Sequence, residues 1–301
     1  MADCSAEHEL KIRPVNVDQA IQPGEFQAIF RPLPAGVFGY LHIMRSLLPL
    51  VLFLSASLCV QAALVEKLVG YSHEGKTMEG FHVYDDAVTG KRPGVLVIHQ
   101  WTGLGDYEKM RSRLLAEMGY NVLAADIYGQ GIRPAPPGAG QEAGKYKEDR
   151  ALFRGRMAAA LDVLKGDGRT DSAKVAAIGY CFGGMGVLEL ARSGASLAGV
   201  ISFHGSLDAA AGMEAQSGAV NAKVMVLHGA VDPYVPAEQV SGFQKEMEGA
   251  KVDWQMVSYG GAVHGFTMKG AGTEPSKGVA YNESADKRSW EAMIVFLAEI
   301  F

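Results

Sequence analysis

The sequence predicts a single domain of the α/β class, in which a mostly parallel sheet has helices on both faces. Three observations support this prediction. The chain has 301 residues, of which 48% are hydrophobic and 20% charged, enough to build the core of one large domain. Short apolar runs alternate with stretches of helical periodicity. The 37 glycines fall between these runs, where strands and helices need tight turns.

Strands are predicted from short apolar runs, several of which suit burial on both faces of a sheet. Residues 76–83 form an entry strand, and Gly94 to His99 is a nearly continuous apolar run. Further strands are expected at residues 121–127, 174–179, 199–203, 223–228 and 252–258. Because helical stretches separate these runs, the strands are expected to be mostly parallel.

Helices are predicted from apolar residues at helical spacing. Met110, Leu114, Leu115 and Met118 recur in this way, and another helix is expected at residues 148–165, after a Pro- and Gly-rich loop at 129–144. The last helix begins near Asn282 and places five apolar side chains along one face: Trp290, Met293, Phe296, Leu297 and Ile300.

Residues 44–62 have the composition of a secretory signal peptide. Arg45 precedes the apolar run from Leu47 to Leu54, and small residues stand before the expected cleavage site after Ala62. The alternative, a membrane anchor, is disfavoured because a spanning helix needs about 20 apolar residues and this run is shorter. Residues 1–43 are then an untranslated or disordered extension, and the domain covers residues 63–301. We expect export, to the periplasm in a bacterium.

Charge and histidine spacing narrow the classes of partner. The formal net charge is −5, and no run of Lys and Arg exceeds two residues, which argues against a nucleic-acid surface or a polybasic membrane patch. The histidines are scattered without a metal-binding spacing, so we expect neither metal nor cofactor. A small-molecule substrate and a monomeric chain without a stable membrane anchor are expected.

A Gly-x-Cys-x-Gly motif follows the predicted strand at residues 174–179. Cys181 lies between Gly179 and Gly183, and a helical stretch comes after it. In a strand-turn-helix elbow of this kind the central residue is a nucleophile, and the head of the helix favours a thiolate. The alternative is a small buried cysteine beside ordinary turn glycines.

An acid and a histidine follow the motif in the order that a catalytic triad on such a sheet requires. Asp232 comes just after the strand at residues 223–228, and His264 lies in a glycine-flanked loop after the next strand. The carboxyl ends of parallel strands meet at one edge of the sheet, so Cys181, Asp232 and His264 can converge there. Taken singly, Asp232 could begin an Asp-Pro turn and His264 could be a solvated loop residue.

From about residue 64 to residue 301, the chain resembles the dienelactone hydrolase family of the α/β-hydrolase superfamily. The resemblance rests on the segments Gly-Tyr-Cys-Phe-Gly-Gly, Gly-Ala-Val-Asp-Pro-Tyr-Val-Pro, Val-His-Gly-Phe, Ala-Asp-Ile-Tyr and Ile-His-Gln-Trp-Thr-Gly. It implies the α/β-hydrolase fold, with Cys181 as nucleophile, His264 as base and Asp232 orienting the histidine. The oxyanion hole would consist of the backbone N–H groups of Phe182 and Trp101.

Three pocket positions depart from the family pattern. Gln100 replaces a glutamate that helps to deprotonate the thiol, and Gln130 and Met268 replace two arginines that hold a substrate carboxylate. Neutral substrates are therefore expected to be preferred, unless another cation reaches the pocket. The candidate cations are Arg133, Arg150, Arg154 and Arg156.

The function predicted from these residues is hydrolysis of a carboxylic ester or lactone through a thioester on Cys181. The alternative from another class is a non-catalytic binding or thiol-sensing protein that uses the same fold.

Overall fold

The computed structural model describes residues 64–301. The predicted signal peptide and the extension before it lie outside the described residues, so both remain predictions. Within the described range no helix combines the length and apolar character needed to cross a membrane.

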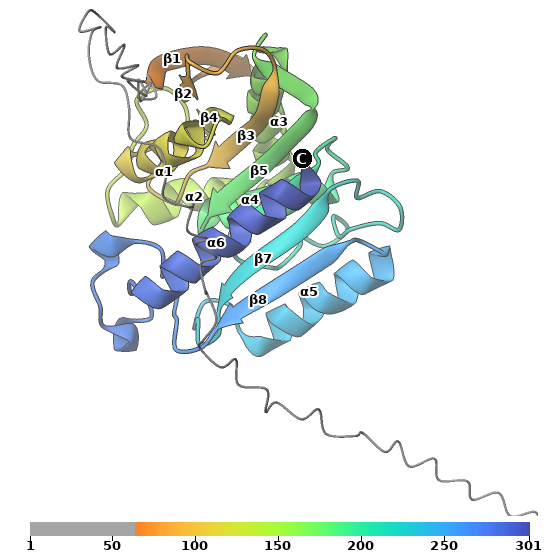
Figure 1. Cartoon of the computed structure of the whole chain (residues 1–301). Coiled ribbons are helices and arrows are strands. Elements are labelled where there is room, and N and C mark those ends of the chain that lie inside the picture. Colours follow the sequence, from red (N-terminus) through yellow and green to blue (C-terminus); the bar gives the residue numbers. More distant parts are fainter. Residues whose placement is uncertain (1–63) are drawn as a thin grey trace, which may run out of the picture. The chain divides into compact units, whose positions relative to one another are not determined.

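One eight-stranded sheet organises the domain, in the order β1-β2-β4-β3-β5-β6-β7-β8 (Figure 1). Every pairing from β4 across to β8 is parallel, and β1 and β2 are antiparallel to their neighbours. The mostly parallel sheet predicted from the sequence is therefore confirmed. The strands are β1 (Leu64–His73), β2 (Lys76–Asp85), β3 (Arg92–Ile98), β4 (Asn121–Ala125), β5 (Thr170–Tyr180), β6 (Gly199–Phe203), β7 (Lys223–Gly229) and β8 (Trp254–Tyr259).

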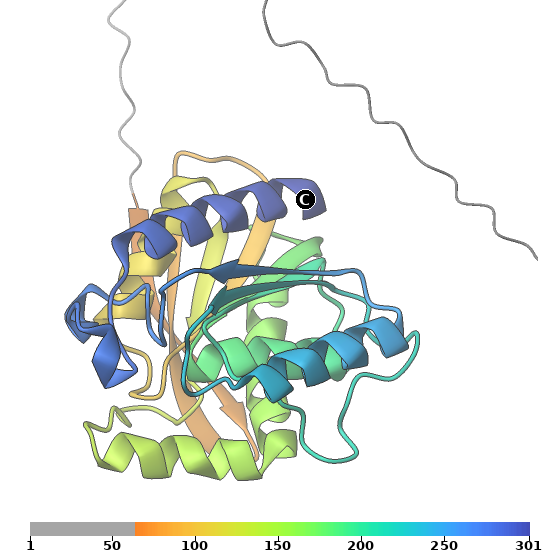
Figure 2. The ribbon, with the colours of Figure 1, turned by 90° about the horizontal axis from the view of Figure 1, so that it is seen from below.

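Helices cover both faces of the sheet. Figure 2 shows α6 on one side and α4 and α5 on the other. The core on the α6 side includes residues of α1, whereas the opposite core includes residues of α2, α3, α4 and α5. The helices are α1 (Asp106–Glu117), α2 (Gly138–Glu148), α3 (Arg150–Gly166), α4 (Phe182–Arg192), α5 (Ala237–Ala250) and α6 (Glu283–Ile300).

Three features differ from the sequence prediction. β1 was not predicted, because all but one of its residues at this sheet edge are exposed or half-buried and they leave no apolar run. α2 occupies the end of the predicted loop at residues 129–144 and buries mainly Ala139, Ala143 and Tyr146. In α1, Leu115 is buried, but Met110, Leu114 and the C-cap residue Met118 are 37–40% exposed, because this helix turns polar side chains toward the sheet.

The arrangement of the strands places the predicted site. β5, β7 and β8 run in the same direction, so the loops that follow them emerge at one edge of the sheet. These loops carry the three residues that the sequence analysis assigned to a triad.

Candidate active site

Cys181 lies in a strained turn between β5 and α4. Its backbone angles are φ 55° and ψ −113°, a conformation that a residue with a side chain rarely adopts. The turn is also crowded: a Cβ on Gly179 would overlap the carbonyl of Gly183, and a Cβ on Gly183 would overlap that of Ile98. The backbone N–H of Cys181 donates to the carbonyl of Phe203, 3.0 Å away, which fixes the turn against β6. This local geometry is that of a nucleophile elbow.

The structure brings Cys181, His264 and Asp232 together. Nε2 of His264 lies 3.0 Å from Sγ of Cys181, and Nδ1 lies 2.9 Å from Oδ2 of Asp232. The Asp232 carboxylate is fully buried, and its other oxygen accepts the N–H of Tyr234 at 2.9 Å. The imidazole is thus aligned between a thiol and a carboxylate, the arrangement that three-residue hydrolytic sites use.

The electrostatics of this pair favour a thiolate beside an imidazolium. Burial opposes the charged form of Cys181, but the hydrogen bond and charge of His264 and the N–H of Phe182 outweigh it and lower the thiol pKa. Burial also opposes the charged form of His264, yet its hydrogen bonds to Asp232 and Cys181 raise the pKa of His264 to about 10. Because the two shifts are opposite, the proton moves from sulfur toward imidazole.

Phe182 and Trp101, whose backbone N–H groups are the predicted oxyanion donors, line the same cavity as Cys181. Phe182 is the first residue of α4, and Trp101 follows the end of β3. Among the described residues no backbone carbonyl accepts a hydrogen bond from either N–H. A helix N-terminus and a loop amide can bind negative charge, and the role of these two N–H groups as oxyanion donors stays a prediction.

A buried carboxylate supports the loop that carries Trp101. Glu108, only 2% exposed, accepts the N–H of Gln100 at 3.1 Å and the N–H of Gly105 at 3.0 Å. The side-chain amide of Gln100 lies 3.5 Å from the same carboxylate. Glu108 therefore holds both ends of the turn that contains Trp101.

The sulfur opens into a cavity of about 540 Å³, large enough for a small ester or lactone. Gln100 and Met268 line this cavity, as predicted, whereas the side chain of Gln130 donates to Glu79 at 2.8 Å and is not part of the lining. α2 contributes Lys147, together with the small residues Gly140 and Ala143. Most of the other lining residues are apolar: Trp101, Phe182, Met185, Val235, Ala271 and Val279.

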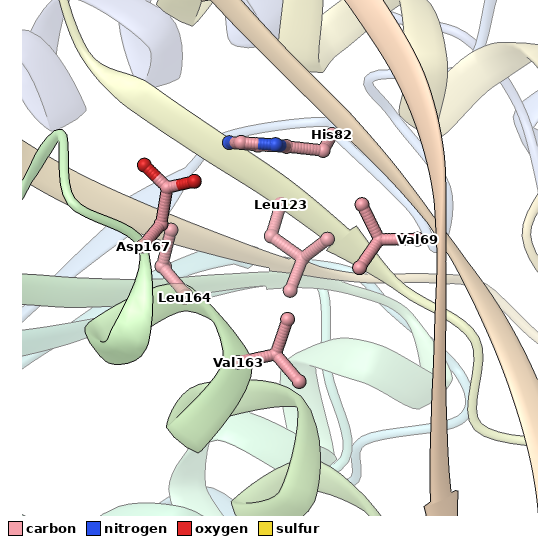
Figure 3. Close-up of a pocket in the computed structure, with 6 residues that line it drawn as sticks. All are labelled: Val69, His82, Leu123, Val163, Leu164 and Asp167. Carbon is pink, nitrogen blue, oxygen red and sulfur yellow. The ribbon is translucent and has the colours of Figure 1, made fainter.

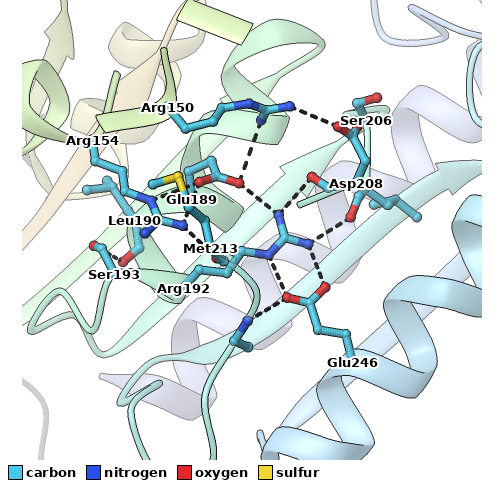
Figure 4. A network of polar contacts seen from close by, with 12 residues as sticks. Arg150, Arg154, Glu189, Leu190, Arg192, Ser193, Ser206, Asp208, Met213 and Glu246 are labelled. Carbon is cyan, nitrogen blue, oxygen red and sulfur yellow. Dashed lines mark hydrogen bonds and ion pairs between the residues drawn. The ribbon is translucent and has the colours of Figure 1, made fainter. Parts of the chain in front are cut away.

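The four arginines considered as substrate cations have other partners. Arg150 and Arg154 contact Glu189, which lies fully buried on α4, and Arg192 and Glu246 extend the same ion-pair network toward α5 (Figure 4). The remaining two bind protein oxygens: Arg133 pairs with Asp126, and Arg156 donates to the carbonyls of Ile127 and Tyr128. None of the four lines the cavity.

A second, smaller cavity lies between β1, β2, β4 and α3 (Figure 3), and it shares no lining residue with the cavity at Cys181. Its volume is about 50 Å³, too small for a substrate, and His82 on its wall is hydrogen-bonded to Asn121 at 2.7 Å. Elsewhere in residues 64–301, no group of three His, Cys, Asp or Glu side chains is arranged to hold a metal ion.

Comparison with known proteins assigns the family. Residues 78–301 match the dienelactone hydrolase family. The chain belongs to the dienelactone hydrolase family. An uncharacterized protein of Caenorhabditis elegans is 39% identical to this dienelactone hydrolase family member over 148 residues, which are 48% of this chain and 92% of that protein.

Solved structures agree with this family assignment. A dienelactone hydrolase-like promiscuous phosphotriesterase from metagenomic libraries is 40% identical, with a TM-score of 0.75 over 79% of this chain and 99% of that chain. An α/β-hydrolase from a deep-sea metagenome shares the fold at 17% identity, with a TM-score of 0.50 over 78% of this chain and 98% of that chain. This dienelactone hydrolase family member is therefore a hydrolase with the α/β-hydrolase fold.

Sequence reasoning missed three features of the candidate site of this dienelactone hydrolase family member. Glu108 stands three residues after Gly105, a spacing that predicts a helix cap. The spacing does not reveal that Glu108 also accepts the N–H of Gln100, the residue before Trp101. Lys147 was missed because α2 was not predicted. His204 belongs to no motif of the sequence, although its ring lies 5.4 Å from that of His264.

Proposed function

We propose that this protein hydrolyses carboxylic esters or lactones through a covalent thioester on Cys181. The observation that carries the proposal is the alignment of His264, with Nε2 3.0 Å from Sγ of Cys181 and Nδ1 2.9 Å from Oδ2 of Asp232. The N–H groups of Phe182 and Trp101, which no backbone carbonyl of the described residues accepts, support it, because acyl transfer needs donors for the developing oxyanion.

In the first half of the reaction the Cys181 thiolate attacks the carbonyl carbon and forms a tetrahedral intermediate. The N–H groups of Phe182 and Trp101 stabilise its oxyanion. When the C–O bond breaks, the His264 imidazolium gives its proton to the leaving alkoxide, and the acyl group remains on sulfur. A lactone opens in the same way, with its alcohol still attached to the acyl group.

In the second half, water attacks the thioester. His264, now neutral, takes a proton from this water, and Asp232 holds the imidazole in the tautomer that can accept it. The second tetrahedral intermediate collapses to the carboxylic acid, and the thiolate and imidazolium return. One water is consumed for each ester bond broken.

The cavity supports a neutral substrate. Its lining is mainly apolar and holds no carboxylate, and Lys147, exposed at the end of α2, supplies the positive charge besides the triad histidine. A neutral lactone or ester can be bound there by apolar contact. Neutral phosphotriesters are a second substrate class, favoured by this lining and by the relative named as a phosphotriesterase.

We also propose that the protein is exported and acts as a monomer. The signal-like composition of residues 44–62 supports export, and a triad built wholly within one chain supports a monomer. Light scattering of the purified protein would measure the oligomeric state.

The test of the proposed function is a panel of neutral esters, lactones and phosphotriesters, assayed with wild type and Cys181→Ala. We expect turnover by the wild type, a thioester detectable by mass spectrometry after rapid quenching, and loss of both in the variant. A wild type that hydrolyses nothing in the panel would favour the thiol-sensing alternative. A variant with unchanged activity would show that Cys181 is not the nucleophile.

A further inference from the structure

His204 is buried behind the proposed base and has no role in the steps above. It follows β6 directly, is 1% exposed and packs its ring edge-on against that of His264, with 5.4 Å between the ring centres. Its φ angle is 39°, in the left-handed region that side chains seldom adopt. Such backbone strain persists where the surroundings demand one side-chain position, and it often marks a functional site.

Hydrogen bonds connect His204 to the loop that carries His264. Nε2 of His204 lies 2.8 Å from Oγ1 of Thr267, three residues after His264. The same Oγ1 lies 2.6 Å from the hydroxyl of Tyr107 on α1. Arg111, one turn further along α1, donates from Nε to Tyr107 and from Nη2 to the carbonyl of Thr267, both at 3.1 Å.

The chemistry of arginine gives this chain of bonds a direction. A guanidinium only donates, so the oxygen of Tyr107 is the acceptor from Arg111. The described contacts give the Tyr107 proton one acceptor, Oγ1 of Thr267. Only if Thr267 donates to Nε2 of His204 do both hydroxyl protons find an acceptor among the described contacts, and Nε2 is then unprotonated. The proton of neutral His204 is left on Nδ1, a buried atom without a hydrogen-bond partner in the described part of the chain.

The charges around His204 also favour its neutral form. Burial lowers the pKa of His204 well below its ordinary value, and the nearby charges of His264 and Arg111 act in the same direction. The titratable and charged groups that face it are His264 from the loop after β8, Tyr107 and Arg111 from α1, and Tyr180 from β5. Arg111 is itself paired with Asp286 of α6 at 2.5 Å. A neutral His204 places no second positive charge against the His264 imidazolium.

We propose that His204 is a positioning residue for His264, held as the neutral Nδ1–H tautomer by the directed chain from Arg111 through Tyr107 and Thr267. The proposal rests on the proposed role of His264 as the base. This series of hydrogen bonds connects the loop of His264 to α1, and the His204 ring packs against the His264 imidazole. Tyr234 packs against His264 as well, with 5.3 Å between the ring centres. The base is thus in contact with two aromatic rings.

The test removes one hydroxyl group. Tyr107→Phe keeps the ring but deletes the bond that orders Thr267, whereas Tyr259→Phe deletes a buried hydroxyl that has no partner in the described residues. With p-nitrophenyl butyrate we expect kcat of Tyr107→Phe to fall about tenfold with KM within about twofold, because the base is misplaced after binding. Tyr259→Phe is expected to retain wild-type values.

A second readout separates positioning from a merely structural role. The pH midpoint for alkylation of Cys181 by iodoacetamide should rise by about half a unit in Tyr107→Phe, because a misplaced imidazolium stabilises the thiolate less well. His204→Gln, which can still accept from Thr267, should retain most of kcat, whereas His204→Phe should not.

The proposal is overturned if folded Tyr107→Phe keeps both the wild-type kcat and the wild-type alkylation midpoint. Thermal unfolding checks that each variant is folded, and Tyr107→Phe decides the question even where His204→Phe does not fold. A wild type without esterase activity would instead contradict the proposed function, so the two failures are distinguishable.

Discussion

Nε2 of His264 lies 3.0 Å from Sγ of Cys181, close enough for one proton to be shared between sulfur and imidazole. Their pKa values move in opposite directions: that of Cys181 falls from 9.0, and that of His264 rises from 6.5 to about 10. The reactive form of this pair is the thiolate with the imidazolium.

The alkylation rate of Cys181 is expected to depend on the thiolate that the His264 imidazolium stabilises. Below the depressed thiol pKa the sulfur is protonated and unreactive, so alkylation by iodoacetamide should increase with pH and reach its midpoint below 9.0. In His264→Gln the imidazolium is absent, and the midpoint should move upward. Measuring alkylation rates by mass spectrometry across pH 4 to about 10 tests this expectation.

Ester hydrolysis should also decline at high pH, because above about pH 10 His264 loses the proton that the leaving group needs.

For the alkylation of Cys181, a wild-type midpoint at or above pH 9.0 would show that His264 does not stabilise the thiolate. A midpoint that is unchanged in His264→Gln would show the same.

The second prediction concerns the turn that contains Trp101. Glu108→Ala leaves the N–H groups of buried Gln100 and half-buried Gly105 without their acceptor, at a cost of about 1–3 kcal/mol of stability for the buried one and less for the other. The turn should shift, and kcat for ester hydrolysis should fall tenfold or more, as expected when an oxyanion donor is displaced. Steady-state kinetics and denaturant unfolding provide the two measurements.

Glu117→Ala, an exposed site at the end of the same helix, is the matched control and should change neither quantity. Alkylation of Cys181 should remain at the wild-type rate in Glu108→Ala, since the thiol and base are untouched. Equal losses of alkylation and hydrolysis would point to a general collapse of the site rather than to the oxyanion turn.

The third prediction concerns the buried ion-pair network of Figure 4. Glu189 contacts Arg154 at 2.7 Å, Arg192 at 3.1 Å and Arg150 at 3.6 Å, and its side chain is fully buried. Glu189→Ala would leave these arginines without their central anion. Because removing one partner of a buried pair is strongly destabilising, we expect a loss of about 3–5 kcal/mol in denaturant unfolding.

Glu299→Ala is the comparison for this network, because it removes a carboxylate from the exposed pair with Lys223 and should leave the unfolding midpoint nearly unchanged. Similar midpoints for the two variants would show that the buried network does not stabilise the fold.

The sequence predicted the inner strands well, because strands buried on both faces are continuous apolar runs. β4, β6 and β7 are examples. It did not predict β1, whose exposed edge carries mixed residues, or α2, which follows a Pro- and Gly-rich segment and has a weak apolar face. Local patterns therefore identify the elements that form the core better than those at its edges.

The candidate site likewise has a part that the sequence predicts and a part that it does not. Cys181, Asp232 and His264 could be placed near one another because each follows a strand of a parallel sheet, and the topology brings those strand ends together. Topology does not determine which group a long side chain contacts. Arg150 and Arg154 turn toward Glu189 rather than the cavity because that buried carboxylate needs cations, a contact between helices that no local pattern encodes.

The fourth prediction concerns export. Expressed in a bacterium from Met44, the protein should be recovered outside the cytoplasm with Ala63 as its first residue, because the apolar run and the small residues before Ala63 suit a signal peptidase. N-terminal sequencing of the recovered protein tests this. Material that retains residues 44–62 would support an anchored or cytoplasmic protein, and a variant with Ala62→Arg, which should block cleavage, provides the control.

The last prediction concerns the charge of the substrate. Gln130 lies outside the cavity, Met268 offers an apolar surface, and the four candidate arginines are held by other groups. A carboxylate in a partly desolvated site normally requires a charged partner, and its absence typically costs a few kcal/mol. We therefore expect the neutral methyl ester of a dienelactone to have a higher kcat/KM than the free acid.

Lys147 is the residue that could reverse this preference, because it lines the cavity from α2 and bears a positive charge. Comparing wild type with Lys147→Met on both substrates isolates its contribution. A preference of about tenfold for the acid, equivalent to about 1.4 kcal/mol, would contradict the expectation. If that preference then disappeared in Lys147→Met while turnover of the methyl ester stayed the same, the lysine would be the carboxylate partner. If it persisted, one of the arginines would have to leave its present partner when substrate binds.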